Sequence, residues 1–166
     1  MEIRLALRED LPSINGIYNQ AVEEKFCTAH LAPVSMDDRM EWFGLHDTGR
    51  FPVYVSTEGR VVTGWISLGP YRTDRQALAH VAEVSFYVKA GYREKGVGSR
   101  LLEYVIGVAP RFSLEILVAI LLDRNGASIA LLKKFGFAEW GRMPGIARIG
   151  REQIDHLYFG LKLIPE

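Results

Sequence analysis

Hydrophobic and polar positions follow two different periods along the chain, and these periods predict strands and helices in alternation. Residues 2–8 alternate apolar and polar side chains one by one, as a half-buried strand does. The spacing then becomes that of a helix, whose N-cap we expect to be Asp10, with Pro12 in the first turn. A second helix is predicted after Ser35, which together with Asp38 resembles a capping box. The apolar residues of this second helix are Met36, Met40, Trp42 and Phe43.

The rest of the chain continues the alternation without a repeat, linker or low-complexity segment. Apolar residues run almost unbroken through 114–121, which is typical of a strand covered on both faces. The order βαα-βββ-α-β-α-ββ predicts an α/β fold, with a mixed sheet and helices on both faces. Its later elements are a hairpin about Glu58-Gly59, a strand over 80–88, a helix ending near Pro110, the strand over 114–121, a helix within 125–137 with Gly136 as C-cap, and a final strand over 154–164.

Length, charge and cysteine usage narrow the class of protein. Because domains usually span about 100–200 residues, residues 1–166 are expected to form a single domain. Lys plus Arg balances Asp plus Glu at 20 each, so no nucleic-acid or membrane partner is indicated. Cys27 is the one cysteine and no Cys/His cluster has metal-ligand spacing, so we expect neither a disulfide nor a metal. The N-terminus lacks a signal-peptide pattern and no apolar run reaches about 18 residues, which favours the cytoplasm.

The stretch 87–110 passes from a strand pattern through a glycine-rich turn into a helix. Such a turn leaves the first amide N–H groups of the helix unpaired, at a site where the helix dipole favours an anion. A nucleotide-triphosphate P-loop would need a lysine where this chain has Val97. A dinucleotide-binding fingerprint would need a third glycine where this chain has Leu101. The sequence therefore predicts an anion site that belongs to neither class.

This turn reads Arg93-x-x-Gly96-x-Gly98, which resembles the R/Q-x-x-G-x-G/A motif of the GNAT acetyltransferase family. The resemblance runs nearly from end to end of the chain. It implies a GNAT fold, in which strands 80–88 and 114–121 splay apart and acetyl-CoA lies between them. The segments IRLALREDLPSINGIYNQAV, EWF, FPVYVS, VTGWISLGPYR, EVSFYV, NGASIALLKKFGFAEWG and IDHLYFGLKL are similar, in this order, to the branch containing phosphinothricin and methionine-sulfone N-acetyltransferases.

The resemblance also implies which residues bind acetyl-CoA. Family members hold the pyrophosphate with backbone amides across the turn, and their first splayed strand pairs with the pantetheine amides like an added strand. Asn125 resembles the asparagine that bonds the pantetheine arm, with Ser128 one turn on, although Asn125 could also be a helix N-cap. Lys133 is expected either to reach a phosphate or to be a solvated surface lysine. The residues carried over are Arg93, Glu94, Lys95, Gly96, Val97, Gly98 and Ser99 for the pyrophosphate, and Phe86, Tyr87 and Val88 for pantetheine.

Glu83 is the candidate catalytic base. Acetyl transfer needs a neutral amine and a route for its proton. Glu83 lies in the otherwise apolar segment HVAEVSFYV, where burial of a carboxylate is costly and raises its pKa toward the range of a working base. The branch that this chain resembles also has a glutamate three residues before the pantetheine-pairing positions. The alternative is a structural ion pair between Glu83 and Arg72.

The acid that would protonate the departing thiolate is missing from its usual place. Many family members have a tyrosine or histidine one residue before the Lys133 position, where this chain has Leu132. The proton could come from solvent, from the substrate ammonium or from one of the tyrosines Tyr71, Tyr87 and Tyr158, although packing or strand pairing is the more usual role of such tyrosines.

The acceptor residues depart from the pattern of the branch. Its R-H-T-V-E-H-S is replaced here by residues 79–85, AHVAEVS, so the basic anchor for an anionic amino acid is partly lost. Arg72 and His80 could still hold a carboxylate or phosphinate through charge-assisted hydrogen bonds. The segment EEKFCTAHLAP resembles a lid over the substrate, with Phe26 as its apolar contact.

The sequence therefore predicts an acetyl-CoA-dependent N-acetyltransferase that transfers acetyl directly to the amine of a small amino-acid-like substrate of the phosphinothricin, methionine-sulfone or sulfoximine type. Two alternatives stay open: a GNAT enzyme for a polyamine, an aminoglycoside or a protein N-terminus, and a non-catalytic acyl-CoA-binding module. Cys27 lies outside the strand–turn–helix site and is not expected to form a covalent intermediate. A homodimer is compatible with the apolar last strand.

Overall fold

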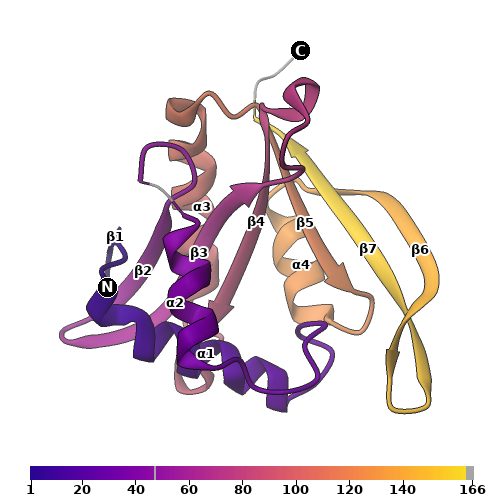
Figure 1. The fold of residues 1–166 in the computed structure, drawn as a ribbon, viewed down its shortest axis with the longest axis horizontal. Helices are drawn as coiled ribbons and strands as arrows, with labels where there is room; N and C mark the ends of the chain where they lie inside the picture. The colour runs from indigo at the N-terminus through magenta and orange to yellow at the C-terminus, as the bar shows by residue number, and fades with distance from the viewer. Residues whose placement is uncertain (47, 164–166) are drawn as a thin grey trace.

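The computed structural model describes residues 1–46 and 48–163, and in these ranges seven strands form one sheet in the order β1-β2-β3-β4-β5-β7-β6 (Figure 1). The strands are β1 (Glu2–Leu5), β2 (Val53–Glu58), β3 (Val61–Pro70), β4 (Val81–Val88), β5 (Ile116–Leu122), β6 (Ala138–Ile149) and β7 (Glu152–Lys162). The α-helices are α1 (Leu11–Glu23), α2 (Met36–Gly44), α3 (Val97–Val108) and α4 (Gly126–Lys134). Short 3-10 turns occur at Arg8–Asp10, Gln76–Leu78, Ala90–Tyr92 and Ala109–Phe112. The predicted order of elements is confirmed.

The sheet is mixed, as expected, with one parallel pair among antiparallel ones. Strands β4 and β5 are parallel, and the other neighbouring strands run antiparallel. A parallel pair needs a long crossover, and here α3 supplies it between β4 and β5. The predicted hairpin is also present, since β2 and β3 are joined at Gly59, which has a positive φ of 59°.

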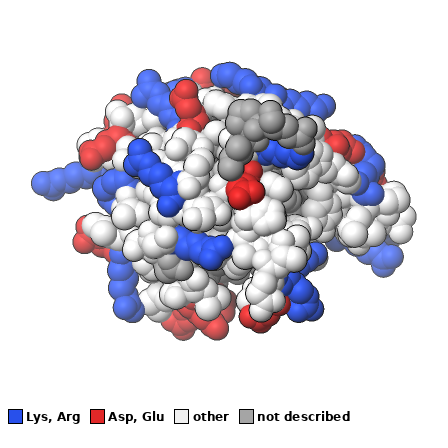
Figure 2. Space-filling model, turned by 90° about the horizontal axis from the view of Figure 1, so that it is seen from above, with Lys and Arg blue, Asp and Glu red and all other residues white. Residues whose placement is uncertain are grey.

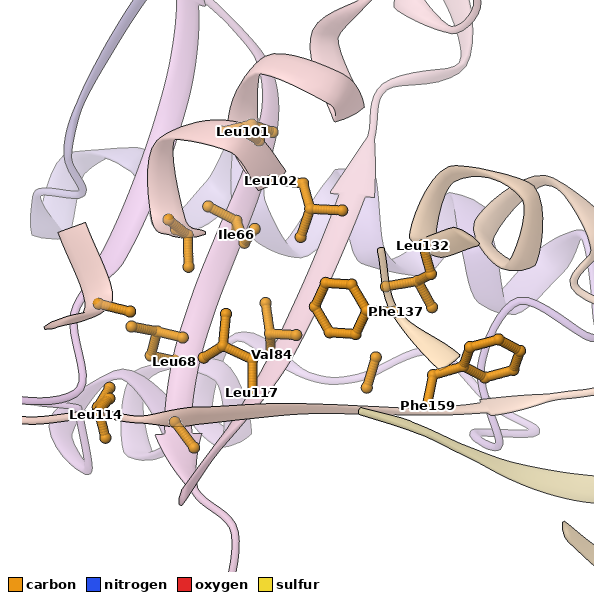
Figure 3. Packing of buried hydrophobic residues seen from close by; sticks show 14 of the residues in the cluster. Ile66, Leu68, Val84, Leu101, Leu102, Leu114, Leu117, Leu132, Phe137 and Phe159 are labelled. Carbon is orange, nitrogen blue, oxygen red and sulfur yellow. The ribbon is translucent and has the colours of Figure 1, made fainter. Parts of the chain in front are cut away.

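The helices cover both faces of the sheet. On one face, α3 and α4 bury a core in which Leu101, Leu102 and Leu132 converge on strand side chains such as Ile66 and Leu117 (Figure 3). On the other face, α1 packs against β2 and β3, and the indole Nε1 of Trp65 donates a hydrogen bond to the carbonyl of Ile14 at 3.1 Å. Truncation of a buried leucine in such a core typically costs about 2–5 kcal/mol, so both layers contribute to holding β3 and β4 in place.

Strands β4 and β5 splay apart after three paired positions. Val81, Ala82 and Glu83 face Ile116, Leu117 and Val118. Beyond these positions β4 continues to Val88 and β5 to Leu122 without pairing to each other, while β5 stays paired to β7. The prediction of two splayed strands is therefore confirmed, although β5 begins at Ile116 rather than at Leu114.

Asp10 does not cap the first helix with its side chain, contrary to the prediction. Its carboxylate instead accepts two hydrogen bonds from the Arg4 guanidinium at 2.7 and 2.9 Å and one from the Leu7 N–H at 2.8 Å. This arrangement bends the chain out of β1, which ends at Leu5 instead of continuing through residue 8. A charge-assisted pair formed by a strand residue was not visible in the local pattern.

The start of α2 is as predicted in part. Ser35 accepts a hydrogen bond from the Asp38 N–H at 3.1 Å, and its hydroxyl donates to the Asp38 carboxylate at 2.6 Å. The expected apolar face of this helix is correct for Trp42 and Phe43, which pack partly buried against the core, and wrong for Met36 and Met40, which are exposed. The buried residue of α2 is Arg39, with 4% of its surface exposed.

Charges of both signs are interspersed on the face of the molecule seen in Figure 2. Within the described residues, no helix combines the length and apolar character needed to cross a membrane. The same part of the chain contains no group of three or more His, Cys, Asp and Glu side chains that could hold a metal ion.

Candidate active site

Two adjoining cavities open where β4 and β5 diverge. One, of about 520 Å³, runs along the glycine turn and α4. The other, of about 600 Å³, lies on the opposite side of β4, against α1, α2 and the segment that joins them. Cys27 and Tyr87 line both cavities, and a passage of about 40 Å³ between the splayed strands contains the same two residues. A molecule bound in one cavity therefore meets a molecule bound in the other at this point.

The glycine turn exposes amide groups to the smaller cavity. Gly96 has a positive φ of 80°, a conformation that disfavours other residues, and is the N-cap of α3. The first hydrogen bond of the helix runs from the Arg100 N–H to the Gly96 carbonyl at 3.0 Å. The N–H groups of residues 97–99 come before that bond, so they have no partner within the helix, and they lie at the positive end of the helix dipole. This turn is therefore suited to a phosphate or pyrophosphate.

Gly98 also allows close packing between helices. A β-carbon at this position would lie 3.0 Å from Cδ2 of Leu131 and 3.6 Å from Cγ2 of Val88. These two neighbours line the smaller cavity from α4 and β4. The absence of a side chain thus lets α3 approach α4 and keeps the cavity open.

Arg93 does not point freely at the cavity. Its guanidinium pairs with the Glu24 carboxylate at 2.7 Å and donates to the Val88 carbonyl at 3.3 Å. These contacts fasten the glycine turn to the end of α1. The geometry therefore favours the backbone amides, more than the arginine side chain, as the groups that hold an anion.

Most residues predicted for the cofactor line the smaller cavity, and two do not. Lys95 and Lys133 lie outside its lining, and the Lys95 ammonium is 5.2 Å from the centre of the Tyr92 ring. The lysine that lines the cavity is Lys134, which sequence reasoning missed. The predicted residues in the lining are Phe86, Tyr87, Val88, Arg93, Glu94, Gly96, Val97, Gly98, Ser99, Asn125 and Ser128.

The spacing along α4 could have identified Lys134. Asn125, Ser128 and Leu131 line the cavity at intervals of three residues, and Lys134 is the next position on that stripe. Asn125 is also the N-cap of α4, because its side-chain Oδ1 accepts a hydrogen bond from the Ser128 N–H at 3.2 Å. The position of Asn125 is thus compatible with both expected roles, as a helix N-cap and as a partner of the pantetheine arm.

The larger cavity contains Glu83, which is half-buried on β4. Burial raises the pKa of the Glu83 carboxyl above its ordinary value, and the positive charge of Arg72 offsets part of this rise. No ion pair joins Glu83 to Arg72 among the residues that the structure describes. Arg72 itself is exposed at the rim, with its guanidinium 5.0 Å from the Tyr71 ring centre. The described residues thus give Glu83 no structural ion pair, and its position in the larger cavity is compatible with the predicted role of a base.

The segment between α1 and α2 covers the larger cavity, in the place predicted for a lid. Cys27, Thr28 and His30 contribute to the lining. The Tyr18 hydroxyl bonds with Thr28 Oγ1 at 2.7 Å and with His30 Nδ1, and these bonds hold the segment against α1. Phe26 is outside the lining, and its ring lies 5.7 Å from the Arg124 guanidinium.

His80 is also outside the lining of this cavity. Its carbonyl accepts hydrogen bonds from the N–H groups of Glu115 and Ile116, at the end where β4 and β5 are still together. The residues that sequence reasoning missed come from other elements: Arg39 and Trp42 from α2, Trp65 and Ser67 from β3, and His156 from β7. No local signal marks these residues, because the cavity forms only when α2 and β7 are brought to β4.

The position expected for the acid carries no proton to donate. Leu132 is 1% exposed, belongs to the core and lines the narrow passage. Burial raises the pKa of the Tyr87 hydroxyl well above its ordinary value, so this group keeps its proton. Tyr158 lines the larger cavity, whereas Tyr71 does not.

Comparison with known proteins agrees with this geometry. The family model described as acetyltransferase (GNAT) family matches residues 14–137. YwnH of Bacillus subtilis, provisionally named a phosphinothricin acetyltransferase, is 40% identical over 164 residues, covering 98% of this chain and 99% of that protein. An L-methionine sulfoximine/L-methionine sulfone acetyltransferase of Salmonella typhimurium is 34% identical, with coverage of 98% and 95%. The structure of yncA of Salmonella typhimurium, provisionally described as an acetyltransferase and determined with its cofactor acetyl-CoA, matches with a TM-score of 0.91 at 32% identity and covers 99% of this chain and 95% of that one.

Proposed function

This chain belongs to the acetyltransferase (GNAT) family, and we propose that it transfers the acetyl group of acetyl-CoA to the amine of a small amino-acid-like acceptor. The observation that carries the proposal is the junction of the two cavities at Tyr87 and Cys27. Glu83 lies in the larger cavity, which is proposed to hold the acceptor and is called the acceptor cavity below. The named acceptors of the relatives, phosphinothricin and methionine sulfoximine or sulfone, are the first compounds to test. The chain is proposed to act as a single domain over residues 1–166 in the cytoplasm.

The smaller cavity fits acetyl-CoA. Unpaired amides at the start of α3 suit the pyrophosphate. The stretch of β4 beyond Glu83 pairs with β3 on one side and with no strand on the other, which leaves backbone groups for the pantetheine amides. Asn125 and Ser128 lie across the cavity from this strand, on α4, and Lys134 supplies a positive charge farther along the same helix.

When bound, acetyl-CoA supplies the acetyl group and a thiolate leaving group. The residues of this chain orient the acceptor and move its proton. Glu83 is proposed to accept the ammonium proton, directly or through one water, so that a neutral amine can form the new N–C bond as the C–S bond breaks. The thiolate then takes a proton from the acceptor side or from solvent, because Leu132 offers none. A backbone N–H of β4 between Phe86 and Val88 is proposed to stabilise the negative charge that develops on the carbonyl oxygen.

The acceptor cavity is lined by charges of both signs: Arg39 and Arg72 together with Asp38 and Glu83. An amino acid carries both an ammonium and a carboxylate and matches this combination. A polycation such as spermidine offers no anionic group to the two arginines.

The test is release of CoA from acetyl-CoA with a panel of acceptors: phosphinothricin, methionine sulfone, methionine sulfoximine, spermidine and an aminoglycoside. A Cys27→Ser background removes the thiol of the protein from a thiol-based assay, and mass spectrometry of the product locates the acetyl group. We expect turnover with the amino-acid analogues and not with the polycations. Turnover confined to spermidine or the aminoglycoside would contradict the proposal.

A further inference from the structure

Arg39 is a buried cation on the wall of the acceptor cavity. Only 4% of its surface is exposed, yet it contributes to the lining. Its guanidinium carbon lies 4.6 Å from the ring centres of Tyr18 and Trp42 and 5.7 Å from that of Trp65. All three aromatic residues also line the cavity. The guanidinium is therefore held in an aromatic box on the inner wall.

Some donor groups of the Arg39 guanidinium have no hydrogen-bond partner among the described residues. Its Nε donates to the side-chain Oδ1 of Asn15 at 3.2 Å, which orients the planar group. Among the described residues, the terminal nitrogens Nη1 and Nη2 donate no hydrogen bond and no carboxylate forms an ion pair with Arg39. The neighbouring acid on α2, Asp38, accepts the Ser35 hydroxyl instead. A buried charge without a partner is costly, so a partner supplied from the cavity is to be expected.

Arg39 and Glu83 face different parts of the same cavity. Trp65, beside Arg39, is opposite Tyr87 in the sheet, whereas Glu83 is opposite Gly69. Four residues along β4 separate Tyr87 from Glu83, which corresponds to about 13 Å between their Cα atoms. The charge that acts on Glu83 is that of Arg72, not that of Arg39. An acceptor whose amine meets Glu83 can therefore direct another polar group toward Arg39.

We infer that Arg39 is a specificity-determining residue that binds a two-oxygen group of the acceptor, such as its carboxylate or the paired oxygens of a sulfone or phosphinate, through Nη1 and Nη2. This inference rests on the proposed function and extends it. The planar fork of a guanidinium matches two oxygens on one atom, and a lysine ammonium does not. The aromatic box and Asn15 hold the fork in place before the acceptor arrives, which reduces the entropy lost on binding.

The experiment compares L-methionine sulfone with two analogues, in wild type and in Arg39→Lys. L-methionine sulfone carboxamide lacks the carboxylate, and L-methionine lacks the sulfone oxygens. In wild type we expect kcat/KM to fall about 10- to 100-fold for whichever analogue lacks the bound group, as hydrogen bonds to a charged group typically imply. The discrimination ratio is the kcat/KM for the sulfone divided by the kcat/KM for the analogue. In Arg39→Lys this ratio should fall to within about threefold of one, with the acetyl-CoA KM unchanged. Loss of discrimination against the carboxamide identifies the carboxylate, and loss against methionine identifies the sulfone.

Ratios within one variant do not depend on how much of the protein is folded, so a destabilised Arg39→Lys still gives a valid result. A second measurement needs no variant. Trp42 and Trp65 flank the guanidinium, so tryptophan fluorescence of the wild type in the presence of CoA should report binding of the sulfone and of each analogue. Arg60→Gln, at an exposed position in the β2–β3 turn, is the matched control and should leave the ratios as in wild type.

Two failures are distinguishable. If wild type neither acetylates nor binds any of the amino-acid analogues in the panel, the proposed function fails, and the inference fails with it. If wild type acetylates the sulfone but both ratios stay the same in Arg39→Lys, Arg39 has only a packing role and this inference alone is overturned.

Discussion

Glu83 and Val118 are the last residues at which β4 and β5 face one another. The carboxylate therefore lies where the two strands begin to diverge, and the side chains that follow on the same face of β4, Ser85 and Tyr87, line the opening. The parallel pair holds the part of β4 that carries Glu83, the candidate base, and beyond Glu83 the edge of β4 that faces away from β3 has no strand partner. This relationship motivates the first two predictions.

Glu83→Gln should reduce kcat by about 100-fold or more, as loss of a general base typically does. The acetyl-CoA KM should stay near that of wild type, because Glu83 is not in the lining of the smaller cavity, which is proposed to hold acetyl-CoA. Steady-state kinetics with the preferred acceptor provides the measurement. Glu103→Gln, at an exposed position on α3, is the control. A kcat of Glu83→Gln within a few-fold of wild type would exclude the carboxylate as the base.

The pH dependence should show the raised pKa of Glu83. The protonated carboxyl cannot accept a proton, so kcat should fall as the pH falls through this pKa, which burial places above the ordinary carboxyl value of 4.5. This limb should be missing in Glu83→Gln. A limb caused by the acceptor amine can be recognised because it moves when an acceptor with a different amine pKa is used. An unchanged limb in Glu83→Gln would assign the titration to another group.

The raised pKa of Glu83 also predicts that Glu83→Gln is at least as stable as wild type. Since the unfolded chain ionises Glu83 more readily than the folded protein, the carboxylate destabilises the fold at neutral pH. This cost shrinks as the pH falls through the folded-state pKa and is gone below the unfolded-state pKa. Glu83→Gln should therefore have a melting temperature at neutral pH that is equal to or higher than that of wild type. A clearly lower melting temperature would indicate that the carboxylate has a structural role.

Gly98→Ala should weaken acetyl-CoA binding by about two- to threefold, because the new methyl group requires a small shift of the Leu131 side chain at the wall of the smaller cavity. Gly107→Ala is a matched control on the same helix, with no atom within 4 Å of the added carbon. It should leave acetyl-CoA binding unchanged and stabilise the helix by about 0.5–1 kcal/mol. Isothermal titration with acetyl-CoA tests both variants. Equal affinities for the two would contradict the role assigned to the glycine turn.

Asp10→Asn should lower the free energy of unfolding by about 2 kcal/mol at neutral pH, because it removes the ionised partner of Arg4 and of the Leu7 N–H. Desolvation raises the pKa of the Asp10 carboxyl, but the hydrogen bonds from Arg4 and Leu7 outweigh it and hold the pKa below the ordinary value. The stabilisation is thus present above the unfolded-state pKa and lost as the pH falls through the folded-state pKa. Urea unfolding at neutral and acid pH should show the difference from wild type shrinking on acidification, with Glu41→Gln as an exposed control.

The periodic pattern of the sequence was sufficient for the order of elements, and the glycine turn and Glu83 could be identified from local signals. Hydrophobic period, glycine placement and a carboxylate within an apolar strand are properties of short segments, and neighbouring residues largely decide them. The resemblance to the GNAT family placed the cofactor residues on β4, the turn and α4, and most of them line the smaller cavity. Lys134 lines the smaller cavity and the predicted Lys133 does not, a difference that depends on the phase of α4.

Only the tertiary structure decided which residues form the acceptor cavity. Arg39 lies between acidic and apolar neighbours on a short helix, a pattern typical of a solvated face, and it is buried because α2 packs across α1 onto Trp65. Asp10 was expected to cap a helix and instead pairs with Arg4 of a neighbouring strand. Burial and pairing of a charged side chain depend on elements brought together from distant parts of the chain, so the physical cost that makes Arg39 informative cannot be seen before the chain is folded.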